Sequence, residues 1–289
     1  MPSARLLVIQ VDASDPPARL GDWLVAAGLE LDVRALDAGA ELPAQLDDHQ
    51  GVLVMGGSMG AWDDSVAPYL PAVRALLRDA VDAEVPTLGV CLGHQLLAAA
   101  TGGQVRRNPA GPEIGAQLVA KRTAASTDPL FGPLPITPDV LQWHYDEVSV
   151  LPAGAIQLYS SPGCEQQAFR LGRTAWGIQF HIETTPQMVR EWAAERDDNL
   201  VDYDMVAVLE RALAIHDDLE EVWQPFAAAF ADIVRDPSGV PAPRTVPSST
   251  AAPVTDPAAI RAALAAELNA ARTMPAPLPM PGLRPSDET

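Results

Sequence analysis

The chain has 289 residues, 48% of them hydrophobic, which is enough for one large domain, or one domain and an appendage, around a substantial core. Its 38 acidic and 19 basic residues give a formal net charge of −19, and such a surface repels nucleic acids and anionic membranes. Two cysteines, Cys91 and Cys164, cannot form a disulfide framework, and the N-terminal apolar run is too short for a signal peptide or a membrane span. We therefore expect a cytoplasmic protein whose partners are neither nucleic acids nor membranes.

The first hundred residues alternate between short apolar runs and amphipathic segments. The apolar runs are typical of strands buried on both faces of a parallel sheet, and they lie at 5–11, 31–36, 51–55 and 87–90. Apolar residues at helical spacing predict helices at 19–28, 68–83 and 93–101. Strands that alternate with helices predict right-handed crossovers and an open, mostly parallel sheet with helices on both faces.

After Gly102 and Gly103 the pattern changes to short strands separated by turn residues. We expect these strands at 114–120, 140–143, 155–159, 167–171 and 174–179, as an antiparallel addition and a strand that returns to the centre of the sheet. Helical segments follow at 186–196, 203–216 and 219–234. The prediction is a flavodoxin-like α/β domain over 1–185 with a C-terminal helical extension over 186–235.

From residue 236 the composition shifts toward proline, alanine, serine and threonine. Eleven of the 28 prolines lie in the last 54 residues. A segment with so little apolar surface cannot offset the entropy lost on ordering. We therefore expect 236–289 to be a largely disordered tail.

Cys91 lies where an apolar strand gives way to a helix, in the sequence TLGVCLGHQ at 87–95. Small neighbours, Gly89 and Gly93, tolerate the strained backbone of a sharp strand-to-helix turn that presents a nucleophile. The helix start adds unpaired N–H groups and a positive dipole end beneath the sulfur, and both favour a thiolate. The alternative interpretation is a buried structural cysteine after a core strand.

A cysteine nucleophile needs a base for the thiol proton and a carboxylate that orients the base. Among five histidines, His181 closely follows an apolar run at 175–178, so it falls at the carboxyl edge where open α/β sheets place their sites. Glu183 can reach its ring if the local backbone is extended. A surface hydrogen bond is the alternative for this pair, but the cysteine at the same edge favours a catalytic role.

Gly56 and Gly57, in the sequence MGGSMG at 55–60, also follow a strand. No lysine follows them, so they do not form a phosphate loop of the Walker type. A flexible turn is one interpretation. The other is a set of exposed backbone N–H groups that binds an oxyanion together with the N–H of Leu92. No Cys/His spacing in the chain suggests a metal site.

Three motifs together resemble those of class I, triad-type glutamine amidotransferases: GVCLGHQ at 89–95, the Gly-Gly pair at 56–57 and QFHIE at 179–183. The segments 108–115 and 142–146 also resemble the stand-alone proteins that are similar to the amidotransferase domain of GMP synthase. The resemblance covers about residues 50–185 well and the first 50 loosely. Two departures stand out: Ile182 replaces the family's usual proline, and the chain after Glu183 extends beyond the usual domain end.

The resemblance implies a function for each motif. Cys91 would be the nucleophile, His181 the base and Glu183 the orienting acid, with no cofactor. The N–H groups of Gly57 and Leu92 would form the oxyanion hole. The positions expected near the bound glutamine are Gln95, Tyr145 and Asp146.

Three functions remain open at this point. The chain lacks anything that resembles the nucleotide-binding loop of an acceptor domain, so a glutaminase would supply ammonia to a partner synthase chain. A free-standing γ-glutamyl peptidase or hydrolase, acting on a modified γ-glutamyl compound, is the second possibility. The third is a non-catalytic binding or regulatory module, which would have no use for Cys91, His181 and Glu183 together.

Overall fold

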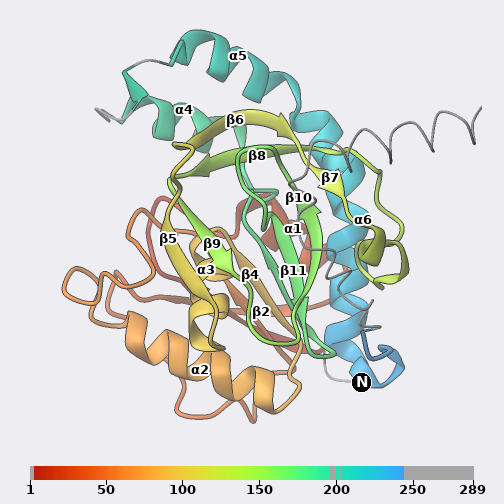
Figure 1. The fold of residues 1–289 in the computed structure, drawn as a ribbon. Helices are drawn as coiled ribbons and strands as arrows, with labels where there is room; N and C mark the ends of the chain where they lie inside the picture. The colour runs from red at the N-terminus through yellow and green to blue at the C-terminus, as the bar shows by residue number, and fades with distance from the viewer. Residues whose placement is uncertain (1–2, 196–199, 202, 244–289) are drawn as a thin grey trace, which may run out of the picture. The chain divides into compact units, whose positions relative to one another are not determined.

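The computed structural model describes residues 3–195, 200–201 and 203–243, and its main feature is one eight-stranded sheet (Figure 1). The strand order is β2-β1-β3-β4-β12-β11-β10-β7. The first five strands of this order are parallel, and the last three pair antiparallel. The predicted flavodoxin-like fold with its antiparallel addition is therefore confirmed. The strands of this sheet are β1 (Arg5–Gln10), β2 (Glu30–Ala35), β3 (Gly51–Val54), β4 (Thr87–Val90), β7 (Ala120–Lys121), β10 (Ile156–Ser160), β11 (Ala168–Leu171) and β12 (Ala175–Ile178).

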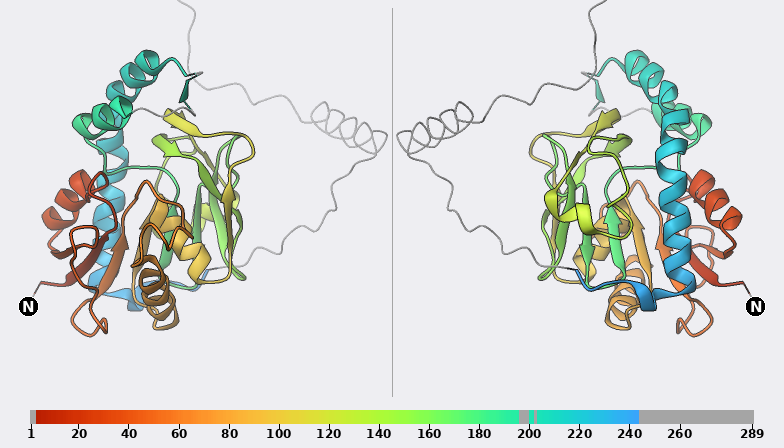
Figure 2. Two further views of the ribbon diagram at one scale, coloured as in Figure 1. Left: turned by 90° about the vertical axis from the view of Figure 1, so that its left-hand side faces the viewer. Right: turned by 90° about the vertical axis from the view of Figure 1, so that its right-hand side faces the viewer.

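Helices cover both faces of the sheet, as the sequence predicts (Figure 2). Helices α1 (Ala18–Ala26) and α6 (His216–Arg235) pack side by side on one face, and α2 (Leu70–Asp82) and α3 (Leu92–Ala100) pack on the other. Alternate residues of β1 enter the two cores: Leu6 belongs to the first and Leu7 to the second, and both are fully buried. This double burial explains why the central strands are continuous apolar runs.

Two short antiparallel ribbons lie beyond the main sheet. One pairs β5 (Gln104–Arg107) with β9 (Asp146–Val150), and the other pairs β6 (Glu113–Leu118) with β8 (Asp139–His144). Only the strands of the second ribbon were expected from the sequence, at 114–120 and 140–143, and their pairing was not specified. The strands of the first are polar, and β5 is largely exposed, so they lack the apolar alternation that marks a strand.

The segment predicted as a helical extension folds into three helices, α4 (Pro186–Ala194), α5 (Met205–Ala214) and α6. The large side chains of α6, including Trp223 and Phe226, lie in the same core as α1. Helix α5 packs on β6 and α4 packs on α5. The domain boundary at residue 185 stays a prediction, and residues 244–289 of the predicted tail lie outside the described residues. The described segments also hold two short 3₁₀ turns, η1 (Thr123–Thr127) and η3 (Pro237–Gly239).

In the part of the chain that the structure describes, every helix is too short or too polar to cross a lipid bilayer.

Candidate functional site

Cys91 stands on the strained turn between β4 and α3. Its backbone angles are φ 50° and ψ −107°, a conformation that residues other than glycine rarely adopt. The turn is tight because backbone atoms approach closely around it: a Cβ on Gly89 would lie 2.4 Å from the carbonyl oxygen of Gly93, and a Cβ on Gly93 would lie 2.1 Å from that of Val54. Both glycines are therefore required to bring β3, β4 and α3 together at Cys91.

His181 and Glu183 form a buried pair just beyond β12. The Nδ1 atom of His181 lies 2.6 Å from Oε1 of Glu183, and the two side chains are 2% and 0% exposed. Since a carboxylate accepts, Nδ1 carries the proton and Nε2 faces the cavity without a hydrogen-bond partner among the described residues. Burial would lower the pKa of His181, but the charges of Glu183 and Cys91 raise it well above its usual value.

The loop that carries Gly57 packs against the start of α3, where Leu92 lies. Leu92 begins α3, so its N–H has no partner within the helix. A Cβ on Gly57 would lie 3.1 Å from Cδ2 of Leu92, which places the loop after β3 against the helix start. Gly57, Leu92 and Cys91 all line one cavity.

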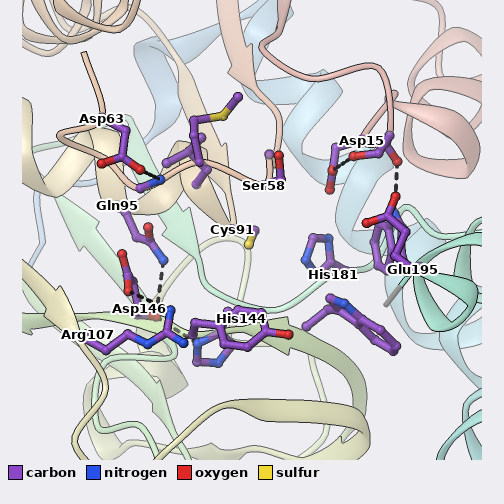
Figure 3. Close-up of a pocket in the computed structure, with 18 of the residues that line it drawn as sticks. Asp15, Ser58, Asp63, Cys91, Gln95, Arg107, His144, Asp146, His181 and Glu195 are labelled. Atoms are coloured by element: carbon purple, nitrogen blue, oxygen red, sulfur yellow. Dashed lines mark hydrogen bonds and ion pairs between the residues drawn. The ribbon is translucent and has the colours of Figure 1, made fainter. Parts of the chain in front are cut away.

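This cavity has a volume of about 350 Å³ and opens at the carboxyl edge of the sheet (Figure 3). Gln95, Tyr145 and Asp146 also line it, as does His181, whereas Glu183 lies behind the histidine. Gln95 donates from Nε2 to the carbonyl oxygen of Asp146 and to Oε1 of Gln179. Burial raises the pKa of the Asp146 carboxyl group, and the charge of Arg107 opposes this rise.

Comparison with known proteins identifies the fold's family. The model of the family "Glutamine amidotransferase class-I" matches residues 19–192, more than half of the chain. The chain belongs to this family. It is 38% identical over 105 residues to a glutamine-hydrolysing GMP synthase subunit of Methanosarcina mazei, across 35% of this chain and 52% of the relative. It is 28% identical over 152 residues to gamma-glutamyl peptidase 4 of Arabidopsis thaliana, across 52% of this chain and 60% of the relative.

A solved structure supports the same assignment. A glutamine amidotransferase of Thermotoga maritima superposes with a TM-score of 0.71 at 28% identity, across 80% of this chain and all of its own. The two relatives above are matched over only about half to three fifths of their length. What is shared is therefore the amidotransferase domain.

Asp15 lines the same cavity, although the sequence analysis did not select it. Asp15 is 6% exposed and accepts a hydrogen bond from Oγ of Ser14 at 2.7 Å. Gly56 lies between Asp15 and His181: a Cβ added to Gly56 would lie 2.6 Å from Oδ1 of Asp15 and 3.3 Å from Cε1 of His181. Burial raises the pKa of Asp15 to about 6, although the charge of His181 acts in the opposite direction. The signal for Asp15 is its place soon after β1, at the same sheet edge as Cys91.

Trp192 of helix α4 forms part of the cavity wall. Its ring meets that of His181 edge-on at a centroid distance of 4.8 Å and lies 5.7 Å from the ring of Trp143. Its Nε1 donates to the carbonyl oxygen of Ser14. The wall of the candidate cavity therefore includes a helix from the region that the sequence analysis separated as an extension, and no local sequence signal marks Trp192.

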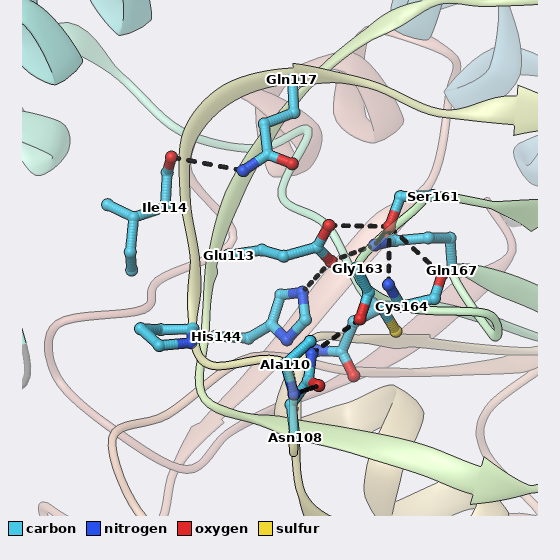
Figure 4. A network of polar contacts seen from close by, with 12 residues as sticks. Asn108, Ala110, Glu113, Ile114, Gln117, His144, Ser161, Gly163, Cys164 and Gln167 are labelled. Atoms are coloured by element: carbon cyan, nitrogen blue, oxygen red, sulfur yellow. Dashed lines mark hydrogen bonds and ion pairs between the residues drawn. The ribbon is translucent and has the colours of Figure 1, made fainter. Parts of the chain in front are cut away.

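His144 links the cavity to a buried polar network (Figure 4). Its Nδ1 lies 2.9 Å from the carbonyl oxygen of Asp146, and its Nε2 lies 3.1 Å from Oε2 of Glu113. Ser161 and Gln167 both donate to the Glu113 carboxylate. The network therefore fixes the backbone of the segment that carries Tyr145 and Asp146.

The second cysteine and the histidine next to the Cys91 turn lie outside the cavity. Burial raises the pKa of Cys164 to about 12, with Glu113 acting in the same direction, so the thiol form is favoured near neutral pH. His94 is fully buried against Phe169, and burial lowers its pKa to about 3. Two groups of described residues bring three possible metal-ligand atoms within 4.8 Å of one another: Glu113, His144 and Cys164 form one group, and Asp15, His181 and Glu183 form the other. In each group a hydrogen bond between the histidine and a glutamate already occupies two of the three possible ligands.

Proposed function

We propose that this chain hydrolyses the side-chain amide of glutamine, or the corresponding amide of a γ-glutamyl compound, through a thioester on Cys91. The observation that carries the proposal is the pairing of His181 with Glu183 at 2.6 Å, which leaves Nε2 unpaired in the cavity that Cys91 lines. A histidine held in this tautomer can accept a thiol proton. Membership of the amidotransferase family supports the reaction class.

Each step of the proposed reaction has a group suited to it. His181 takes the proton of Cys91, and the thiolate attacks the γ-carbonyl carbon. The backbone N–H groups of Gly57 and Leu92 donate to the oxyanion that forms, a contribution that is typically worth about 10²–10³ in rate per donor. His181 then gives its proton to the leaving nitrogen, the C–N bond breaks, and water cleaves the thioester with His181 again as base.

Two fates of the nitrogen define the two candidate functions. If glutamine is the substrate, ammonia leaves, and a partner synthase chain would use it; the relative that forms part of a GMP synthase supports this interpretation. If the substrate is a modified γ-glutamyl compound, an amine leaves and no partner is needed. The relative that is a gamma-glutamyl peptidase supports the second interpretation, as does a cavity that continues past Cys91 to Trp192.

The test measures glutamate and ammonia released by the purified chain from glutamine and from a γ-glutamyl anilide. We expect Cys91-dependent release of glutamate from at least one of them, accompanied by a γ-glutamyl adduct in the intact mass. Cys91→Ser should abolish release, whereas Cys164→Ser, the matched control, should retain it. Glutamate release that survives in Cys91→Ser would contradict the proposal.

A further inference from the structure

The cavity has two chemically different ends, with Cys91 between them (Figure 3). Figure 3 shows His181, Asp15 and Glu195 on one side of Cys91 and a second polar group on the other. The members of that second group are Asp63, Gln95, Arg107 and Asp146. Because the cavity extends in both directions, a substrate larger than glutamine can occupy both ends at once.

The chemistry decides which end receives which part of the substrate. The leaving nitrogen must face Nε2 of His181, because this atom delivers the proton that the nitrogen needs. That atom is buried, and because Nδ1 pairs with Glu183, it is the atom through which His181 interacts with Cys91 and with the substrate held there. The leaving group therefore lies on the side of His181, and the glutamyl α-amino and α-carboxylate groups lie on the opposite side, where Arg107 and two carboxylates converge.

We propose that the end beside His181 is a subsite for a positively charged amine, so that the substrate is the γ-glutamyl amide of a diamine or polyamine. The inference rests on the proposed function and specifies its leaving group. Two carboxyl groups, those of Asp15 and Glu195, line this end together with the ring of Trp192. Ammonia is too small to need such a lining.

The charges of the lining favour a cation over other leaving groups. Asp15 is 6% exposed, and its pKa of about 6 leaves it mostly ionised at neutral pH, so a cation at hydrogen-bond distance would be a favourable partner. The rings of Trp192 and Trp143, 5.7 Å apart, both line the cavity, and aromatic rings attract an ammonium group through their faces. A leaving group with its own carboxylate would face two acids, because Arg107 lies at the other end and the positive charge of His181 is already paired with Glu183.

The reaction then balances without any co-reactant besides water. The amide C–N bond breaks as the C–Sγ bond to Cys91 forms, and the thiol proton passes through His181 to the nitrogen that leaves. The free amine departs with its distal ammonium group unchanged. Water then cleaves the thioester, and its oxygen and protons complete L-glutamate and the restored thiol.

The test compares kcat/KM of the full chain for four γ-glutamyl substrates. They are the cationic amide of diaminobutane, the neutral amide of pentylamine, the anionic amide of aminobutyrate, and glutamine. We expect the cationic amide to exceed the neutral one by about tenfold, the value of one charge-assisted hydrogen bond, and the anionic one by more. Equal values, or a preference for the anionic amide or for glutamine, would overturn the inference.

Variants assign the preference to the subsite. The ratio of kcat/KM for the cationic and neutral amides should fall severalfold in Glu195→Gln and in Asp15→Asn. The ratio should stay unchanged in Glu191→Gln. Glu191 is an exposed residue of α4, the helix that Glu195 follows, and among the described side chains it bonds only Gln187. The ratio does not depend on overall activity, so Glu195→Gln remains informative if Asp15→Asn is poorly active.

The outcomes also separate the inference from the proposed function. Cleavage of none of the four substrates, or cleavage that persists in Cys91→Ser, would overturn both. Cys91-dependent cleavage without a preference for the cationic amide would overturn the inference alone. Cys91-dependent cleavage with a preference that neither Glu195→Gln nor Asp15→Asn reduces would also overturn it.

Discussion

At the scale of single residues, Glu183 is held by two hydrogen bonds rather than one. Its Oε1 accepts from His181, and its Oε2 accepts from the backbone N–H of Ile182 at 2.9 Å. A proline at position 182, as the family usually has, would fix φ but has no N–H to donate. With isoleucine at position 182, φ is not fixed by a ring, but the backbone N–H is present and donates to the Glu183 carboxylate, which it orients. The departure from the family pattern is compatible with an oriented acid.

Glu183→Gln tests this arrangement. The amide has one acceptor oxygen, so it cannot accept from both His181 and Ile182, and the imidazolium formed in the reaction loses its counter-charge. We expect kcat to fall by more than about tenfold with KM nearly unchanged, the pattern of lost transition-state stabilisation. Steady-state kinetics on the best γ-glutamyl substrate would measure this. Normal kcat in Glu183→Gln, together with a loss in Asp146→Asn or Glu147→Gln, would reassign the acid.

The two cysteines should differ in reactivity. Cys91 lines an open cavity beside His181, whereas Cys164 is buried in the network around Glu113, where burial raises its pKa to about 12. Because the thiolate is the reactive form, brief treatment with iodoacetamide near neutral pH should alkylate Cys91 first. Peptide mass spectrometry would show the order, and preferential labelling of Cys164 would contradict the assigned nucleophile.

Asp15 should make the stability of the protein fall as the pH rises. Its pKa of about 6 lies above the usual 3.8, so the folded state binds the proton more tightly than the unfolded chain does. Stability is therefore lost as the pH rises from about 4 to about 6, by about 3 kcal/mol for a shift of about two pKa units. Asp15→Asn removes this loss. The difference in unfolding free energy between variant and wild type should grow by that order between pH 4 and pH 8.

Denaturant titrations at the two pH values would measure this difference. Subtracting the difference in unfolding free energy at pH 4 from that at pH 8 cancels any pH-independent destabilisation caused by the new amide. Asp79→Asn, at an exposed position of α2, is the matched control and should show little pH-dependent change. A pH-independent difference in Asp15→Asn would mean that Asp15 ionises normally in the folded protein.

At the scale of helices and strands, the sequence predicts the elements whose burial pattern is regular along their length. Strands such as β1 and β4 are buried on both faces, so their apolar runs are unambiguous, and α2 shows its stripe clearly because its other face is exposed. Strands β5 and β9 could not be predicted, because they pair with each other and carry polar side chains on a partly solvated ribbon. Their pairing depends on contacts about 40 residues apart in the chain, which local patterns do not contain.

The same reasoning separates the candidate site into a predictable and an unpredictable part. Cys91, His181 and Gly57 all follow strands of the parallel sheet, so their meeting at one edge follows from the fold. Trp192 lies on α4, and its contact with His181 depends on how that helix packs, which no motif encodes.

Gly93→Ala tests the packing of elements beneath the nucleophile. The added Cβ would lie 2.1 Å from the carbonyl oxygen of Val54, a backbone atom that can move away only if β3 and α3 separate. We expect a loss of at least about 3 kcal/mol in the free energy of unfolding, or no folded protein. Gly239→Ala, which has open space around the new Cβ, is the control. Normal thermal stability of Gly93→Ala would contradict the close crossing.

At the scale of the whole molecule, the first helix of the described chain packs against the last one. Helix α6 packs against α1, and Arg19 donates to the carbonyl oxygen of His216, almost 200 residues later. Trp192 brings the C-terminal region to the cavity in the same way. The helices after residue 185 therefore contribute to the core and to the cavity wall, and removing them should affect both.

The last described residues contact the core and Arg170, and these contacts predict where the chain can be shortened. Val240 is buried in the core, and the carbonyl oxygen of Pro241 accepts at 2.6 Å from Arg170, a 3% exposed side chain that also pairs with Asp128. A chain ending at Pro243 keeps these contacts. We expect it to melt at the same temperature as the full chain and to retain the proposed γ-glutamyl hydrolase activity.

A chain ending at Asp236 loses both contacts and leaves the buried guanidinium of Arg170 one acceptor short. An unsatisfied buried donor costs about 1–3 kcal/mol, and in a domain of this size each kcal/mol lowers the melting temperature by about 2–4 °C. We therefore expect this chain to melt several degrees below the one ending at Pro243, as calorimetry would measure. If the chain ending at Pro243 instead lost activity while remaining folded, residues 244–289 would have to belong to the site, and the predicted boundary of the tail would be wrong.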